Sequence, residues 1–201
     1  MNYLAHIYLS GDNEMVCIGN FIADHIKGSQ YKTYPEDIQK GILLHRQIDS
    51  FTDAHEIARK SKRRLHEQYG LYKGIIIDIF YDHMLAKNWS QYSKLELSDY
   101  TKDFYAQLTD HDAFLPEKIK YMSAYMIPQD WLLSYAEKQG IQKVLEGMNR
   151  RTGGTSKMDL AILDLEENYD DFESDFKVFF EELRDFCELK LSEIENLYDP
   201  T

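Results

Sequence analysis

Apolar residues recur every three or four positions along most of the chain, and no stretch alternates apolar and polar residues long enough to predict a β-strand. This pattern predicts an all-α protein. One helix should begin at Pro35-Glu36-Asp37, because proline and acidic residues are typical of a first helical turn. Further helices are expected at about 73–89, 97–108, 116–138 (a stretch that Pro128 could interrupt) and 141–149.

The last quarter of the chain consists of a loop followed by an acidic helical segment. The segment RRTGGTS at 150–156 is the clearest loop. After it, residues 159–197 predict one long acidic helix or a kinked pair of helices. The apolar residues expected to form its buried stripe are Leu160, Leu163, Phe172, Phe176, Phe179, Phe180 and Leu183.

Composition supports one globular unit. The chain has 201 residues, of which 43% are apolar and 29% charged, values typical of a single folded domain without disulfides. The longest apolar runs are far shorter than a membrane span, and no secretory signal stands in front of Cys17 and Cys187. We therefore expect a single helical domain over residues 1–201, located in the cytoplasm, with both cysteines as free thiols and no membrane partner.

The net charge of −12 is unevenly distributed. Residues 159–201 carry 15 acidic and three basic side chains, so they account for the whole excess, while residues 1–158 are balanced. Only one dense basic cluster is present, and its residues are Arg59, Lys60, Lys62, Arg63 and Arg64. Because a nucleic-acid-binding protein usually carries a large basic surplus, DNA and RNA are weak candidates as partners.

The most informative residues are ionisable side chains that interrupt apolar helical segments. A buried carboxylate without a partner costs several kcal/mol, so these residues need neutralising groups. One divalent cation bound by imidazoles and carboxylates would neutralise all of these residues together. Mn²⁺, Fe²⁺, Zn²⁺ and Mg²⁺ accept such ligands. The residues are His6, Asp24, His45, Asp49, Asp78, Asp82 and His83, all within the first 90 positions.

Structural interpretations of these residues stay open at this point. His6 could be a hydrogen-bonded core histidine. His45 and Asp49, four residues apart, could form only an intrahelical pair, whereas Asp78 and Asp82 could cap a helix or pair with Arg46. Asp53 and His55 most simply end the helix that begins after Pro35.

Four sequence blocks, in order and with matching spacing, resemble the acyl carrier protein phosphodiesterases. These blocks are Met1 to Leu9, Gly19 to Asp24, Gly41 to Asp53 and Asp78 to Leu85. The resemblance is weaker beyond about residue 90, although Trp131-Leu132 and residues 144–151 also look like the family. It implies an all-helical fold related to the HD-domain metal-dependent phosphohydrolases. The four blocks do not contain the adjacent His-Asp pair of that fold, and Asp82-His83 stands in reversed order.

The resemblance further implies an activity. The enzyme would hydrolyse the phosphodiester that attaches 4′-phosphopantetheine to a serine of acyl carrier protein, with Mn²⁺ as the metal. We expect His6, Asp24, His45, Asp49 and Asp82 to bind that metal. Arg46 would hold a phosphate oxygen, His83 or a carboxylate would act as general acid or base, and Asp78 would bind the metal or orient an imidazole.

Acyl carrier proteins are acidic, so their docking requires local positive charge. The basic cluster at Arg59, Lys60, Lys62, Arg63 and Arg64 is the expected docking surface, with Arg150-Arg151 as a smaller second candidate. A solvated helix face is the structural alternative for this cluster. Two other functions stay open: an HD-like phosphohydrolase of a nucleotide or small phosphodiester, and a non-catalytic helical binding protein.

Overall fold

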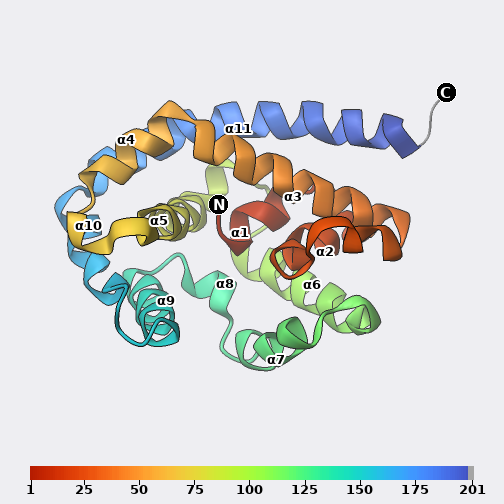
Figure 1. The fold of residues 1–201 in the computed structure, drawn as a ribbon, viewed down its shortest axis with the longest axis horizontal. Coiled ribbons are helices and arrows are strands. Elements are labelled where there is room, and N and C mark those ends of the chain that lie inside the picture. Colours follow the sequence, from red (N-terminus) through yellow and green to blue (C-terminus); the bar gives the residue numbers. More distant parts are fainter. Residues whose placement is uncertain (199–201) are drawn as a thin grey trace.

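The computed structural model describes residues 1–198, and these residues form helices joined by turns, without a β-strand (Figure 1). The all-α prediction is confirmed. The α-helices are α1 (Tyr3–Tyr8), α2 (Glu14–Ile22), α3 (Glu36–Ala54), α4 (Glu56–Arg64), α5 (Lys73–Lys87), α6 (Leu97–Asp110), α7 (Glu117–Met126), α8 (Trp131–Ser134), α9 (Lys138–Arg151), α10 (Ala161–Glu167) and α11 (Tyr169–Tyr198). None of them is both long and apolar enough to span a membrane.

Helix α1 lies at the centre of the molecule, between α2, α3 and α5, and the long α11 runs beside α3 along one edge (Figure 1). The phenylalanines of α11 explain this position, because Phe172, Phe176, Phe179 and Phe180 are fully buried. Burial of large aromatic side chains is a dominant source of stabilisation. The acidic C-terminal segment is therefore anchored to the core by one apolar face.

Two glycines let α2 and α3 touch backbone to backbone. A Cβ atom on Gly19 would lie 2.2 Å from the carbonyl oxygen of Ile38, and one on Gly41 would lie 2.0 Å from that of Val16. No side chain fits at such distances. This close crossing brings Asn20 of α2 directly against His45 of α3.

The observed helix boundaries confirm some of the expectations and differ from others. Helix α3 begins at Glu36 after Pro35, and the chain is not helical between Met126 and Trp131, so the break near Pro128 is confirmed. Helix α9 begins earlier and ends later than expected, and the loop after it starts at Thr152.

The C-terminal segment is a kinked pair, with Asn168 between α10 and α11. The expected burial of Leu160 and Leu163 is wrong, because these side chains are 42% and 61% exposed. Leu160 lies in a 3-10 turn, and the short α10 turns Ala161 and Leu165 to the core instead.

Candidate metal centre

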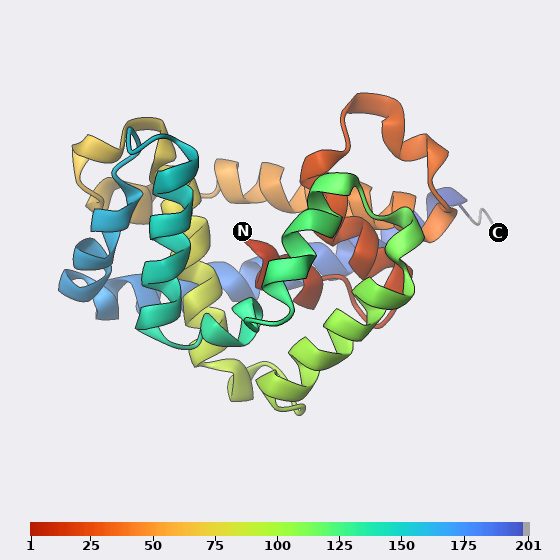
Figure 2. The same ribbon diagram turned by 90° about the horizontal axis from the view of Figure 1, so that it is seen from below.

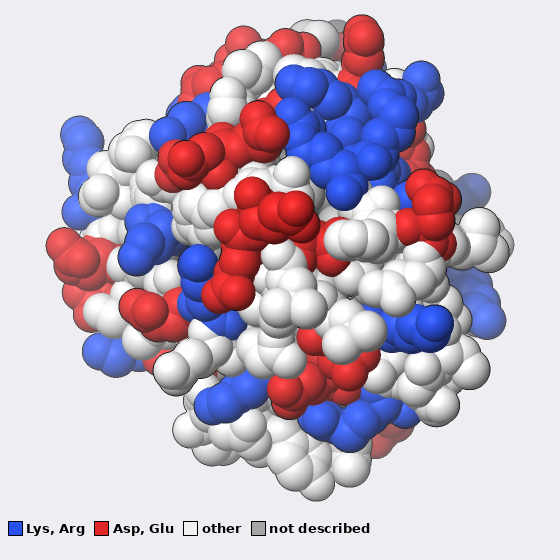
Figure 3. Space-filling view, turned by 90° about the vertical axis from the view of Figure 1, so that its left-hand side faces the viewer, with Lys and Arg blue, Asp and Glu red and all other residues white. Residues whose placement is uncertain are grey.

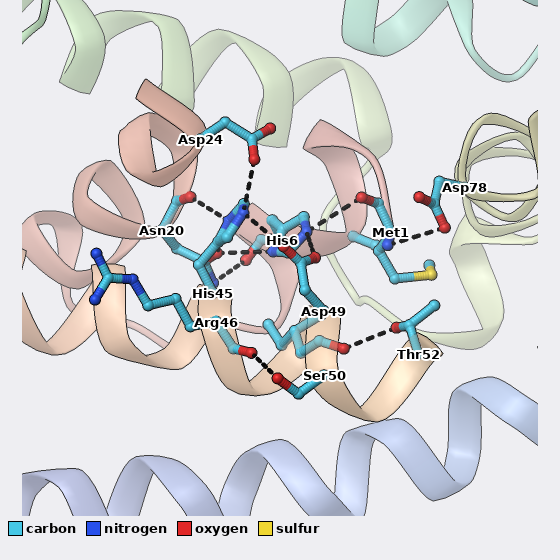
Figure 4. Close-up of polar contacts among 12 residues, drawn as sticks. Met1, His6, Asn20, Asp24, His45, Arg46, Asp49, Ser50, Thr52 and Asp78 are labelled. Atoms are coloured by element: carbon cyan, nitrogen blue, oxygen red, sulfur yellow. Dashed lines mark hydrogen bonds and ion pairs between the residues drawn. The ribbon is translucent and has the colours of Figure 1, made fainter. Parts of the chain in front are cut away.

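Three separate helical segments within the first 54 residues bring polar side chains together at the centre of the fold (Figure 4). His6 comes from α1, Asn20 from α2 and Asp24 from the 3-10 turn Ala23–His25 that continues α2. His45 and Asp49 come from α3, one helical turn apart, so both project from the same face.

The nitrogen and oxygen atoms of this cluster converge on a small volume. The His6 and His45 rings stack with their centroids 4.0 Å apart. His45 Nε2 lies 3.2 Å from Asp24 Oδ1 and 3.2 Å from Asp49 Oδ2, and His6 Nε2 lies 3.5 Å from Asp49 Oδ1. One donor atom each from His6, His45 and Asp49 lies within 4.8 Å of the other two.

Asn20 fixes the tautomer of both imidazoles. Its side-chain Oδ1 accepts a hydrogen bond from His6 Nδ1 (2.8 Å), and its main-chain oxygen accepts one from His45 Nδ1 (2.8 Å). The Asn20 amide nitrogen donates to the His6 carbonyl and to Ser10, which identifies its oxygen as the acceptor. Each neutral ring therefore keeps its proton on Nδ1 and turns the lone pair of Nε2 toward the carboxylates.

The electrostatics of the two rings differ. Burial, reinforced by the neighbouring His45, lowers the pKa of His6 to about 4, so His6 is neutral at neutral pH. Burial opposes protonation of His45 as well, but hydrogen bonds to Asp24 and Asp49 outweigh it and raise its pKa to about 9. The hydrogen bond to His45 likewise lowers the pKa of Asp24.

Burial would raise the pKa of Asp49, yet its contacts with the two imidazoles lower it. Without a metal, two carboxylates thus face one protonated imidazole, and the cluster carries a net negative charge. The donors fit a divalent cation, because one nitrogen each of His6 and His45 and one oxygen of Asp49 converge on one place, with Asp24 beside His45. The side chains of Asp24 and Asp49 are 65% and 46% exposed, so this place is accessible from solvent.

The structure does not bring Asp82 to this cluster. The carboxylate of Asp82 is fully buried and accepts hydrogen bonds from the main-chain nitrogens of Leu4 (2.7 Å) and Ala5 (3.1 Å). Burial raises its pKa to about 7. Asp82 therefore holds the first turn of α1, which carries His6, and supports the cluster from behind.

Asp78 lies beside the cluster, and its carboxylate pairs with the Met1 amino group at 3.1 Å. The Met1 carbonyl oxygen lies 3.2 Å from His6 Nε2, so this ion pair secures the segment that covers His6. Asp78 itself takes no part in the convergence of donor atoms on His45 (Figure 4).

His83 and Arg46 point elsewhere. His83 Nδ1 donates to the Tyr135 carbonyl (2.7 Å), and its Nε2 lies 3.0 Å from the Tyr169 hydroxyl, on the other side of α5. Arg46 projects away from the cluster (Figure 4) and donates to the Ile26 and Gly28 carbonyls. Arg46 thus positions the loop that follows Asp24, and neither side chain contacts His6, His45 or Asp49.

The basic cluster on α4 is divided between structural contacts and free surface. Lys60 and Arg64 both pair with the buried Asp175 of α11, and Lys62 pairs with Asp53 of α3 at 3.1 Å. Arg59 and Arg63, four residues apart, are exposed and form no ion pair with any described residue. Figure 3 shows a dense group of lysines and arginines in the region of α4.

His55 lies outside the metal cluster. It caps α4 by accepting from the main-chain nitrogen of Ile57 and pairs with Glu182, which is consistent with its expected place at a helix end. Sequence reasoning missed the role of Asn20. The sequence does carry a signal for Asn20, because this polar residue interrupts the apolar helical segment Gly19-Asn20-Phe21 in the same way that His6 interrupts its own segment.

Comparison with known proteins places the chain in a family. The sequence profile described as acyl carrier protein phosphodiesterase matches residues 1–183. Proteins named acyl carrier protein phosphodiesterase from Photorhabdus laumondii and Serratia proteamaculans are each 31% identical, the first over 94% of this chain and 96% of its own length, the second over 91% and 95%. One from Escherichia coli is 30% identical over 90% of this chain and 94% of its own length. No solved structure matches, so the relation to HD-domain folds stays a prediction. The chain belongs to the acyl carrier protein phosphodiesterase family, a family of phosphodiester hydrolases.

Proposed function

We propose that this protein removes 4′-phosphopantetheine from holo-acyl carrier protein by hydrolysing the phosphodiester to its serine, with a divalent cation in the His6–His45–Asp49 cluster. The observation that carries the proposal is the pair of imidazole Nε2 atoms turned toward two carboxylates by a single asparagine. His45 Nε2 faces two carboxylates, and His6 Nε2 faces Asp49 in addition to the Met1 carbonyl oxygen.

His6, His45 and Asp49 would hold the cation, with Asp24 as a fourth ligand or as the group next to it. A bound divalent cation neutralises charge on the phosphoryl group and makes a water molecule more acidic. Mn²⁺ is the ion that we propose, and the mixed nitrogen and oxygen donors are compatible with it.

Asp24 is positioned to accept a proton from the attacking water. Its side chain is the most exposed of the cluster, and the hydrogen bond from His45 lowers its pKa, so it is ionised at neutral pH. We assign it the role of general base at a carboxylate oxygen. His6, His45 and Asn20 are buried beneath it, and their fixed orientation preserves the geometry during turnover.

The function can be tested by mass analysis of holo-carrier protein incubated with the chelated protein and added Mn²⁺, Mg²⁺, Fe²⁺ or Zn²⁺. We expect loss of one phosphopantetheine group from the carrier, dependent on the metal. Asp49→Asn should reduce the rate by at least about a thousandfold, because it removes a donor and a charge from the cation site. Saturating metal should also raise the unfolding free energy of the wild type, by about 2.7 kcal/mol at a hundred times the dissociation constant.

Asp53→Asn is the matched control, since Asp53 lies one turn further along α3, is exposed and pairs only with Lys62. It should retain activity and metal-dependent stabilisation. Equal activity in Asp49→Asn and wild type would refute the metal site. A carrier protein of unchanged mass after incubation with the wild type would refute the function.

The exposed part of the α4 basic cluster is the proposed docking surface for the acidic carrier protein. Helix α4 follows α3 after a single residue, so Arg59 and Arg63 lie close to the end of the helix that carries His45 and Asp49. Because Lys62 and Arg64 are engaged with Asp53 and Asp175, docking should depend mainly on the arginines that remain free.

The double variant Arg59→Glu/Arg63→Glu should raise KM for holo-carrier protein by about tenfold or more and reduce the salt dependence, with kcat little changed. Lys94→Glu/Lys102→Glu, at exposed positions before and within α6, makes the same change in net charge away from α4. An equal rise in KM for both double variants would show that only overall charge matters and would exclude α4 as the docking site.

A further inference from the structure

A cleft of about 830 Å³ lies beside the candidate metal centre, between α9 and the start of α1. Figure 2 shows α9 on one side, the α7–α8 region on the other, and the N-terminal residues between them. A phosphodiester group needs only a small part of this volume, whereas clefts of this size commonly bind ligands as large as a drug or cofactor. The cleft therefore has room for a substrate part beyond the phosphate.

The cleft and the metal centre share a wall. Asn2 and Tyr3 line the cleft and directly follow Met1, whose carbonyl oxygen lies 3.2 Å from His6 Nε2. Ile79 lines it from α5 and directly follows Asp78, which pairs with the Met1 amino group. A ligand in the cleft would thus reach the cluster across the first residues of the chain.

Positive charge lies in the lining of the cleft. Arg151, at the end of α9, lines the cleft together with Tyr3 at the start of α1. An arginine here suits a phosphate oxygen, which it can bind through two parallel hydrogen bonds.

The rest of the lining mixes apolar, polar and charged residues. Ile79, Val144, Met148 and Trp131 provide apolar surface, Asn2 and Ser134 provide hydrogen-bonding groups, and Lys143, Glu146 and Arg150 are charged. A long ligand in which methyl and methylene groups alternate with amides matches this lining, and a purely apolar ligand does not. The 4′-phosphopantetheine arm is such a ligand, with its phosphate at one end.

We propose that this cleft binds the pantetheine part of the substrate's prosthetic arm, with the phosphate beside Arg151. The proposal rests on the proposed phosphodiesterase function and adds the site that selects this phosphodiester over others. Pantetheine alone, which lacks both the phosphate and the carrier protein, should then bind to the protein without a metal.

Trp131 offers a direct signal for this binding. The chain has two tryptophans, and the other, Trp89, is only 4% exposed and lines no part of the cleft. Titration of the chelated protein with pantetheine should change the tryptophan fluorescence in a saturable way, and Trp131→Phe should abolish the change. With 4′-phosphopantetheine, Arg151→Gln should weaken binding by about tenfold while leaving the affinity for pantetheine unchanged.

Gly147 provides a way to fill the cleft. A Cβ atom at this α9 position would meet only the end of the Arg150 side chain, at 3.7 Å, so a larger side chain can enter the cleft without moving the backbone. Gly147→Phe should weaken pantetheine binding and raise KM for holo-carrier protein, each by about tenfold or more. Gln139→Phe, exposed on the same helix and outside the cleft, is the matched control and should change neither.

The outcomes separate this inference from the proposed function. If the wild type releases phosphopantetheine but Gly147→Phe acts on holo-carrier protein with an unchanged KM, the cleft assignment fails and the function stands. If pantetheine binds at Trp131 but the carrier protein is never hydrolysed, the function fails and the cleft assignment stands. Absence of saturable pantetheine binding, or tighter binding of adenosine monophosphate than of 4′-phosphopantetheine, would overturn the inference.

Discussion

At the contact between α4 and α11, the buried carboxylate of Asp175 is surrounded by donors. Lys60 and Arg64 pair with it, and Ser61 donates a hydrogen bond of 2.8 Å. At the centre of the fold, by contrast, the carboxylates of Asp24 and Asp49 face imidazole nitrogens. Both clusters place acidic groups against helices from distant parts of the chain, yet their charges are balanced in different ways.

The difference lies in whether the positive charge is permanent. A lysine and an arginine stay charged over the whole working pH range, so the Asp175 cluster is complete and leaves nothing for a ligand to add. An imidazole can give up its proton, and Asn20 holds both rings so that Nε2 is the atom that becomes free. A balanced cluster joins helices, whereas an unbalanced one can exchange a proton for a metal ion.

The largest effect on stability should come from breaking the balanced cluster. Asp175→Asn leaves Lys60 and Arg64 without their buried partner, and we expect it to lower the free energy of unfolding by about 3 kcal/mol, measured by urea denaturation. Stabilisation by added metal should persist in this variant. Asp171→Asn is the control, because Asp171 meets Arg64 from an exposed position and should cost less than about 0.5 kcal/mol. Equal losses in the two variants would contradict the structural role of Asp175.

A smaller effect should follow from separating the helices that form the unbalanced cluster. Gly41→Ala places a methyl group where only 2.0 Å is available to the Val16 carbonyl oxygen, so α2 and α3 must move apart. We expect a loss of about 2 kcal/mol in unfolding free energy, together with weaker metal binding, because Asn20 moves away from His45.

Gly74→Ala makes the same chemical change in α5, where the nearest atoms belong to the flexible end of Lys62, at 3.6 Å or more. There the substitution should be neutral or stabilise by up to about 1 kcal/mol, since alanine favours helix. If calorimetry of metal binding gave the same affinity for Gly41→Ala and Gly74→Ala, the close crossing would not be what positions the cluster.

The smallest effect is a pH dependence of the chelated protein. The pKa of His45 is raised from 6.5 to about 9, so its protonation stabilises the fold fully below pH 6.5, and this contribution is lost as the pH rises to about 9. His6, with its pKa lowered to about 4, destabilises the fold only as the pH falls below 6.5, so the two windows do not overlap. Between pH 6.5 and 9, urea titrations should show a decline of about 1 to 3 kcal/mol in the wild type. His45→Gln should flatten this decline, and an identical decline in that variant would assign the effect to other groups.

Much of the helical arrangement follows from local pattern. Apolar spacing identified α3, α5 and α6, and Pro128 marked the break between α7 and α8, because these signals depend on neighbouring residues alone. The exposure of Leu160 and Leu163 could not be predicted in this way. A helical period defines a face of a helix, but the tertiary packing decides whether another element covers that face.

The candidate site shows the same limit. His6, Asp24, His45 and Asp49 were recognised as polar interruptions of apolar segments, and the structure brings them together. Asp82 gives an identical signal, yet its partners are main-chain N–H groups of α1, which no side-chain pattern records. Its neighbour His83 projects about 100° further around α5 and meets Tyr135 instead.

Asn20 gives the centre of the molecule an all-or-none character. One residue orients both rings, since its side-chain oxygen binds His6 and its main-chain oxygen binds His45. A shift of α2 would misalign the two imidazoles together, so loss of one should entail loss of the other. We therefore expect no state in which only one of the two histidines is correctly oriented. Release of the metal ion should coincide with the first separation of α1, α2 and α3.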